Sequence, residues 1–158
     1  MRKLRTYSSR KFLWAWIVVY FILVSGGIFL LRDQWGYDDP FITYRYARNL
    51  SSGLGFVYNP GERILSTTTP FFTLMLAAIS GFVNNIPKAA NLIGAMSIAA
   101  GAVAIYDIAA SHLSPIVGWT GLLLYPSSVL LLDTIGSETP LYIFLCLASF
   151  AFYYRGRI

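Results

Sequence analysis

The feature that most constrains the fold is a succession of long apolar stretches separated by short polar breaks. The first stretch, Phe12–Leu31, runs for 20 residues without a charge. A helix needs about 20 apolar residues to cross the hydrocarbon core of a bilayer, whereas the apolar part of a cleavable signal peptide has about 7–15. We therefore interpret this stretch as an uncleaved membrane anchor. Four further apolar stretches follow it: Pro70–Ile86, Ala89–Ala110, Ile116–Leu132 and Leu141–Tyr154.

The charged residues are few and unevenly placed. They make up 12% of the chain, against about a quarter in soluble domains. Five of the 12 Lys and Arg residues lie in the first 11 positions, and a basic cluster before a span indicates a cytoplasmic N-terminus. No basic groove interleaved with aromatic residues is present, so we expect no nucleic acid partner. The sequence predicts an all-α polytopic protein of the lipid bilayer.

The number of spans follows from the charges between them. If all five stretches crossed, Arg155 and Arg157 would lie outside, against the positive-inside rule. If Pro70–Ile86 does not cross, this conflict disappears. We therefore expect a single module over residues 1–158 with four transmembrane helices. Residues 32–69 would form the first external loop, and Pro70–Ile86 would be an interfacial or re-entrant helix, which is permitted where other protein covers the backbone.

The polar stretch "GYDDPFITYRYARNLSSGLGFVYNPGERI" at residues 36–64 follows the anchor. Asp39 suits an N-cap and Pro40 a first helical position, while Gly53 suits a left-handed stop. These signals predict a short helix over 40–51. Farther on, residues 59–62 (Asn-Pro-Gly-Glu) predict a tight turn, because Pro fixes φ and Gly tolerates a positive φ.

Two acidic elements contain the candidate catalytic or cation-binding residues. Asp38 and Asp39 sit at a helix N-terminus, whose partial positive charge keeps a carboxylate ionised, so either can serve as a base or hold a cation. Arg45 and Arg48 lie on the helix that follows. The second element, "DTIGSETP", contains Asp133 and Glu138 and is either a helix start or a second wall of the same cavity. Taken singly, each feature is better explained as a cap, a solvated face or a turn, whereas two adjacent carboxylates on a short helix directly after an anchor favour a site.

The remaining reactive residues give no further site. Cys146 cannot form an internal disulfide, and His112 has no nearby partner in the sequence. The chain therefore offers no spacing typical of a His/Cys metal site.

The segments "YDDPFITYRYARNLSSGLGFVYNPGERI…TTTPFFTLML" and "IGSETPLY" resemble parts of a known family. The first is similar to the first external loop of bacterial membrane glycosyltransferases of the GT-C superfamily, closest to arabinofuranosyltransferases and protein-mannosyltransferase-like enzymes. The second resembles the family's later Gly-x-Glu-Thr-Pro/Ala-Leu element. Together they cover most of residues 36–142 in the family's order. The chain resembles the N-terminal module of these enzymes, so we expect the remainder of the enzyme or partner chains to complete it.

The resemblance implies transfer of a sugar from a polyprenyl-phosphate carrier to an acceptor hydroxyl on the outer face of a bacterial plasma membrane. Asp38 or Asp39 would be the general base, and Glu138 would line the second side of the catalytic site. Phosphate contacts would come from Arg45, Arg48 and Arg63, because guanidinium groups match phosphate in bidentate fashion. The three carboxylates at positions 38, 39 and 138 would share a Mg²⁺ or Mn²⁺ ion if the enzyme uses one, since some members of the superfamily do and others do not.

Two other functions are compatible with the sequence. The chain is either a non-catalytic membrane module, acting in assembly or in binding of lipid phosphate, or a small transporter with acids on an ion path. The transporter is disfavoured because the acids cluster in loops and not at span centres.

Overall fold

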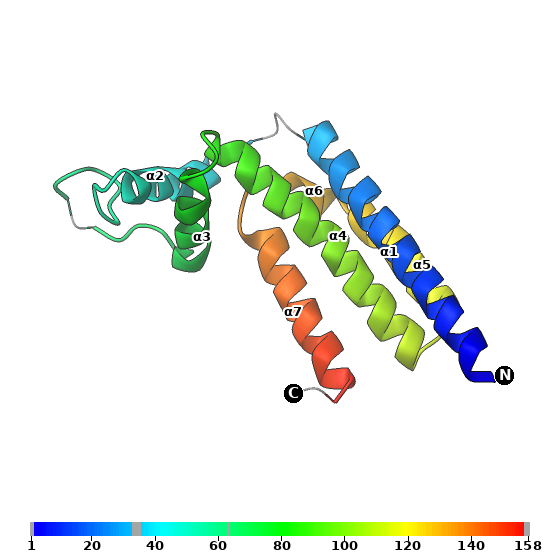
Figure 1. Cartoon of the computed structure of the whole chain (residues 1–158). Coiled ribbons are helices and arrows are strands. Elements are labelled where there is room, and N and C mark those ends of the chain that lie inside the picture. Colours follow the sequence, from blue (N-terminus) through cyan, green and yellow to red (C-terminus); the bar gives the residue numbers. More distant parts are fainter. Residues whose placement is uncertain (1, 33–35, 63, 157–158) are drawn as a thin grey trace.

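The computed structural model describes residues 2–32, 36–62 and 64–156, with side chains from residue 15 onward. Within these residues the secondary structure is helical and contains no strand (Figure 1). The elements, in chain order, are α1 (Arg2–Arg32), α2 (Asp39–Ser51), α3 (Pro70–Ser80), α4 (Ile86–His112), α5 (Pro115–Leu124), the 3-10 turn η1 (Tyr125–Ser127), α6 (Val129–Asp133) and α7 (Thr139–Tyr154).

Proline marks the beginning of five of these helices. Helices α2, α3, α4, α5 and α7 each carry Pro in the first two positions, where its missing N–H costs no intrahelical bond and its fixed φ suits the helix. Two of the starts are also capped by side chains, because Asn85 accepts from the Lys88 N–H at 3.0 Å and Ser114 from the Val117 N–H at 3.3 Å. The sequence therefore specifies locally where most helices begin.

Three segments are long and apolar enough to cross a membrane: Ala15–Arg32, Ile86–His112 and Pro115–Asp133. The expected count of four spans is not confirmed, because α7 is apolar but has 16 residues, and a span needs about 20. The stretch expected to be interfacial contains α3, whose 11 residues extend about 16 Å. Such a helix is shorter than the hydrocarbon core of about 30 Å.

The third long segment is not the uninterrupted helix that its apolar sequence suggests. It consists of α5, η1 and α6, with Ser128 in an extended conformation at ψ 113°. Pro126 lies at this break, and a proline inside a helix removes a hydrogen bond and clashes with the preceding turn.

Helix α4 is the centre of the bundle and packs against α1, α5 and α7 (Figure 1). Its buried positions are mostly small, which allows close approach. A Cβ added at Gly94 would lie 2.9 Å from Ile135 Cγ1, and one added at Gly101 would lie 2.8 Å from the Tyr125 hydroxyl oxygen. Ile98 is fully buried among these contacts.

Helices α2 and α3 form an arm that extends to one side of the bundle (Figure 1). A cluster of buried side chains holds the arm together and joins it to the start of α4. Its members are Tyr44, Ala47, Phe72, Leu76, Ala77, Ile86 and Ala90. The polar stretch is therefore folded against the bundle.

An ion pair is found at each end of the bundle. Arg32, the last residue of α1, pairs with Asp133 at 3.3 Å, and we call this the Arg32 end. At the opposite end Arg155 pairs with Asp107, and the rings of His112 and Tyr154 lie 4.7 Å apart. Helix α1 begins and α7 ends at this opposite end (Figure 1).

Candidate functional site at the Arg32 end

The two polar elements singled out in the sequence meet at the Arg32 end of the bundle. Tyr44 on α2 donates a hydrogen bond from its hydroxyl to the Gly136 carbonyl oxygen at 2.7 Å, across 92 residues of sequence. The Tyr44 side chain is 6% exposed. Burial, with a smaller contribution from Tyr37, raises the pKa of the Tyr44 hydroxyl above its ordinary value. The group therefore stays protonated and remains a hydrogen-bond donor.

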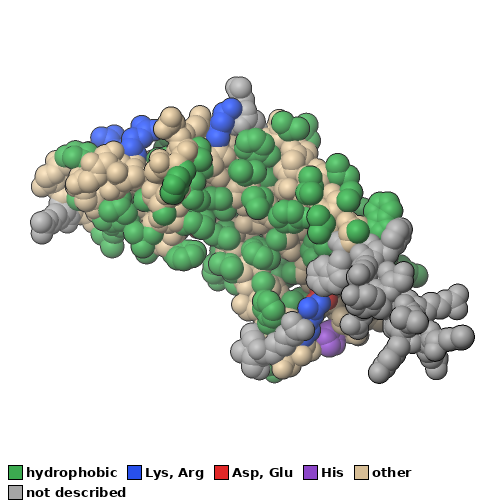
Figure 2. Space-filling view, in the orientation of Figure 1, with side chains coloured by type: hydrophobic (Ala, Val, Ile, Leu, Met, Phe, Trp, Pro, Cys, Tyr) green, Lys and Arg blue, Asp and Glu red, His purple; other side chains and the backbone are tan. Residues whose placement is uncertain are grey.

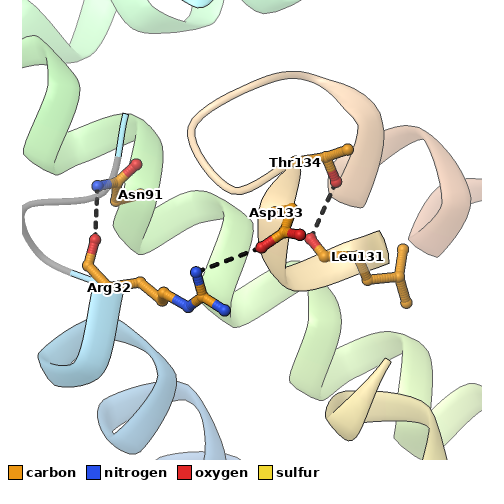
Figure 3. A network of polar contacts seen from close by, with 5 residues as sticks. All are labelled: Arg32, Asn91, Leu131, Asp133 and Thr134. Atoms are coloured by element: carbon orange, nitrogen blue, oxygen red, sulfur yellow. Dashed lines mark hydrogen bonds and ion pairs between the residues drawn. The ribbon is translucent and has the colours of Figure 1, made fainter. Parts of the chain in front are cut away.

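Gly136 is the residue that permits this contact. Its φ of +92° is in the left-handed region that disfavours side chains. A Cβ at this position would lie 2.7 Å from Asn91 Oδ1 and 2.8 Å from the Tyr44 hydroxyl oxygen. Asn91, from α4, donates in turn to the Arg32 carbonyl oxygen at 3.1 Å (Figure 3). Side chains and backbone from α1, α2, α4 and the α6–α7 loop thus converge on one point.

Asp133 lies beside this point and is held by the end of α1. Figure 3 shows the Arg32 side chain extending toward the Asp133 carboxylate, and the two are 3.3 Å apart. The sequence predicted the element "DTIGSETP", which contains Asp133, to be a helix start or a cavity wall. Its second half does begin α7, with Pro140 in the first turn. Asp133 itself is the last residue of α6 and takes part in an ion pair that joins α6 to α1.

Asp38 and Asp39 are both exposed at the start of α2. The expected cap at Asp39 was wrong, because Asp39 is the first helical residue and Asp38 occupies the cap position. Asp38 has helical backbone angles, φ −67° and ψ −40°, and its side chain makes no capping bond. A capping side chain usually requires an extended backbone to reach the N–H groups of the first turn. The two carboxylates are therefore not occupied by capping.

The two aspartates line an open hollow of about 560 Å³. The other residues around it are Tyr37, Phe41, Ile42 and Tyr58. The two carboxylates therefore share one hollow at the surface of the arm with the aromatic rings of Tyr37, Phe41 and Tyr58.

Glu138 occupies the N-cap position of α7 and lines a different groove, of about 250 Å³. That groove is largely apolar and lies between the first turn of α3 and the first two turns of α7. Its other lining residues are Thr68, Thr69, Pro70, Phe71, Phe72, Leu141, Tyr142 and Leu145. The three predicted catalytic carboxylates therefore belong to one end of the molecule but to two hollows.

The predicted phosphate-binding arginines differ in their surroundings. Arg45 donates to the Tyr58 carbonyl oxygen at 3.1 Å and to Asn59 Oδ1 at 3.4 Å, and its guanidinium carbon lies 4.7 Å from the centre of the Tyr58 ring. Arg48, one turn later, is exposed. Arg63 lies outside the described residues.

The turn that Arg45 contacts was predicted correctly. The Glu62 N–H donates to the Asn59 carbonyl oxygen at 3.1 Å, and Gly61 has a φ of +90°. Arg45 therefore fixes this turn against α2 and presents part of its guanidinium edge to solvent.

In residues 2–32, 36–62 and 64–156, no three His, Cys, Asp or Glu side chains converge as a metal-binding group. The Mg²⁺ or Mn²⁺ ion shared by the carboxylates at positions 38, 39 and 138 stays a prediction. Sequence reasoning missed the parts played by Tyr44, Asn91 and Gly136. Asn91 offered a signal, because an amide within an apolar span usually faces the bundle interior.

Fold and site together define a helical protein with three segments long and apolar enough to cross a membrane, whose polar contacts converge at one end of a bundle. Comparison of the chain with protein-family models, with curated proteins and with solved structures finds no match.

Proposed function

We propose that the chain is a membrane glycosyltransferase, or the N-terminal module of one, that transfers a sugar from a polyprenyl-phosphate donor to an acceptor hydroxyl. The observation that supports this proposal is the hydrogen bond of 2.7 Å between Tyr44 and Gly136. It joins the two segments that resemble GT-C enzymes, "YDDPFITYRY" and "IGSETPLY". A shared site requires these segments to lie on the same side of the membrane, and this contact meets that requirement.

The proposed reaction needs one base and one leaving group. Asp38 or Asp39 accepts the proton of the acceptor hydroxyl, whose oxygen then bonds to the anomeric carbon of the sugar. The bond between that carbon and the phosphate oxygen breaks, and the polyprenyl phosphate leaves with the electron pair. The exposed, uncapped carboxylates suit the role of base, and positioning with charge neutralisation supplies most of the acceleration.

The leaving phosphate needs positive charge. Arg48 is exposed on α2, and the guanidinium of Arg45 retains donors beyond those bound to Tyr58 and Asn59. We assign phosphate contact to these two residues and to Arg63, which follows the turn. Glu138 forms the second side of the site, and a Mg²⁺ or Mn²⁺ ion between it and an aspartate would supply further charge where the enzyme uses a metal.

The proposal places the N-terminus in the cytoplasm of a bacterial cell and the Arg32 end on the outer side of the plasma membrane. Helix α7 is then the fourth span, because it packs against α4 and is followed at its end by the Asp107–Arg155 ion pair. Its 16 residues extend about 24 Å, which is less than the hydrocarbon core of about 30 Å. Local thinning of the bilayer, or charged side chains that flank the helix and reach to the interface, must compensate for this difference. The α2–α3 arm then lies at the outer interface.

The decisive experiment measures sugar transfer by the complete enzyme in membranes with a polyprenyl-phosphate-linked sugar. Asp38→Asn and Asp39→Asn are compared with Glu62→Gln, an exposed carboxylate on the same external segment. Loss of the general base lowers the rate about 10²–10⁴-fold, whereas Glu62→Gln should retain activity. Wild-type rates in both aspartate variants would exclude either residue as the base.

A non-catalytic module that binds lipid phosphate is the second candidate. The observation that favours it is the placement of Glu138 and the two aspartates in separate hollows. Saturable binding of a polyprenyl phosphate, weakened in the Arg45→Ala/Arg48→Ala variant and accompanied by no transfer, would support this function. Transfer activity that depends on Asp38 or Asp39 would exclude it.

A further inference from the structure

Part of the segment expected to lie outside the membrane carries an apolar surface. Ile64, Leu65, Phe71 and Leu74 are 63%, 67%, 66% and 52% exposed, and we call these four residues the apolar floor. Figure 2 shows hydrophobic side chains along the lower side of the α2–α3 arm, continuous with those of the bundle, and Lys and Arg side chains on its upper side. An exposed apolar surface of this kind marks a site of contact with a membrane or a partner.

The groove between α3 and α7 relates one residue of the floor, Phe71, to positions along the bundle. Gly94 packs against Ile135 and Gly136, eight residues and about 12 Å along α4 from Ile86. Helix α7 begins just after this level. The first turn of α3 shares a groove with α7 residues as far as Leu145, a further six residues or about 9 Å. If α4, which extends about 40 Å, spans about 30 Å of hydrocarbon, the groove between α3 and α7 reaches into the acyl-chain region.

A non-helical segment at that depth needs partners for its backbone, because the hydrocarbon supplies none. Tyr46 provides them. Its side chain is 0% exposed, and its hydroxyl donates to the Ile64 carbonyl oxygen at 2.6 Å while accepting from the Ser66 N–H at 2.9 Å. A tyrosine hydroxyl thus takes the place that water would have at an external loop.

The threonines that follow also form hydrogen bonds with backbone groups. The Thr69 N–H donates to the Thr67 hydroxyl at 3.3 Å. Thr73 donates from both its N–H and its hydroxyl to the Thr69 carbonyl oxygen, each at 3.0 Å. The hydroxyls of the "STTTP" stretch therefore satisfy local backbone groups at the start of α3.

We propose that residues 64–74 insert into the acyl-chain region of the leaflet at the Arg32 end, with lipid chains covering the apolar floor. The arm is then an amphipathic element. Its α3 side lies in the acyl chains of the leaflet, while the exposed arginines of α2, Arg45 and Arg48, meet the headgroups or water. Insertion does not depend on the proposed sugar transfer or on which side of the membrane the Arg32 end faces.

The experiment uses the full chain reconstituted at about one molecule per vesicle in phosphatidylcholine, with Cys146 replaced by Ser. Single cysteines introduced as Leu65→Cys, Phe71→Cys and Ser51→Cys each carry an environment-sensitive fluorophore. Ser51 is the matched control, because it is exposed on α2 of the same arm. Lipids brominated on the acyl chains should quench the probes at 65 and 71 about twofold or more above the control, whereas aqueous iodide should quench the control more strongly.

Two outcomes would overturn the proposal. Iodide quenching at positions 65 and 71 equal to that at position 51 would place the floor in water. Protection of both positions from iodide and from brominated chains would show that protein covers them. Near-ultraviolet circular dichroism of each labelled variant verifies folding, and Leu74→Cys replaces any variant that fails this check.

Discussion

At the scale of single residues, the contact between Tyr44 and Gly136 joins the arm to the bundle. Tyr44→Phe removes the hydroxyl and leaves the Gly136 carbonyl oxygen without this donor. A buried acceptor left unsatisfied costs about 1–3 kcal/mol, so we expect a lower midpoint of thermal unfolding in detergent. Tyr142→Phe, at a tyrosine that is exposed on α7, is the control and should leave the midpoint unchanged. An unchanged midpoint in both variants would show that the Tyr44 bond is not stabilising.

Gly136 itself gives a second prediction. Gly136→Ala imposes both a positive φ on a side chain and a clash with Tyr44 and Asn91. Gly61→Ala imposes a positive φ alone, because nothing lies within 4 Å of a Cβ there. We expect the Gly61 variant to lose about 1 kcal/mol and the Gly136 variant to lose more, as measured by denaturant unfolding. Equal losses would mean that the α6–α7 loop moves away from Tyr44 without cost.

At the scale of elements, close packing of α4 against the interrupted segment α5–η1–α6 gives a prediction about helix contacts. A Cβ at Gly101 would lie within 3.1 Å of two ring carbons and the hydroxyl oxygen of Tyr125, and Tyr125 begins the 3-10 turn that contains Pro126. Gly101→Ala should therefore destabilise the bundle by about 1–3 kcal/mol, as overpacking does. Gly27→Ala is the control, since its Cβ would meet nothing within 4 Å. Thermal unfolding that ranks the two variants equally would contradict this packing.

The sequence predicted elements better than contacts. Pro40 in the first turn of α2, the left-handed Gly53 and the turn at residues 59–62 are local signals that the sequence predicted, and all three are found in the structure. The interruption at Pro126 was present in the sequence but was outweighed by hydropathy, because apolar residues surround it. The approach of Tyr44 to Gly136 is different in kind. It depends on how helices pack across 92 residues, and no local pattern distinguishes Tyr44 from Tyr46.

The candidate site, too, could be predicted from the sequence only in part. The two acidic elements were recognisable as residue types, and the hydrogen bond from Tyr44 to Gly136 joins the segments that carry them at the Arg32 end. Which carboxylate lines which hollow depends on side-chain direction, which the sequence does not encode at single positions. The "STTTP" hydroxyls show this most clearly, since hydrogen bonding to the backbone and phosphate contact require the same residue types.

At the scale of the whole molecule, the path of the chain across the membrane makes one prediction that depends on every helix. Ser52 follows α2, Ser111 lies at the end of α4 and Gly156 follows α7, and all three are exposed. If α3 does not cross, Ser52 and Ser111 are separated by the single crossing of α4. If α5–α6 and α7 both cross, Gly156 returns to the side of Ser111. In a Cys146→Ser background, a membrane-impermeant maleimide should therefore label Ser52→Cys in intact cells, and label Ser111→Cys and Gly156→Cys after lysis.

Each alternative topology gives a different labelling pattern. Labelling of positions 52 and 111 together in intact cells would mean that α3 crosses the membrane despite its 11 residues. Labelling of position 156 with 52 would mean that one of the two later segments fails to cross, and the 16-residue α7 is the shorter of them. Protection of position 52 with labelling of 111 and 156 would reverse the orientation. The Arg32 end would then face the cytoplasm, where a transferase of the proposed kind has no outer acceptor to act on.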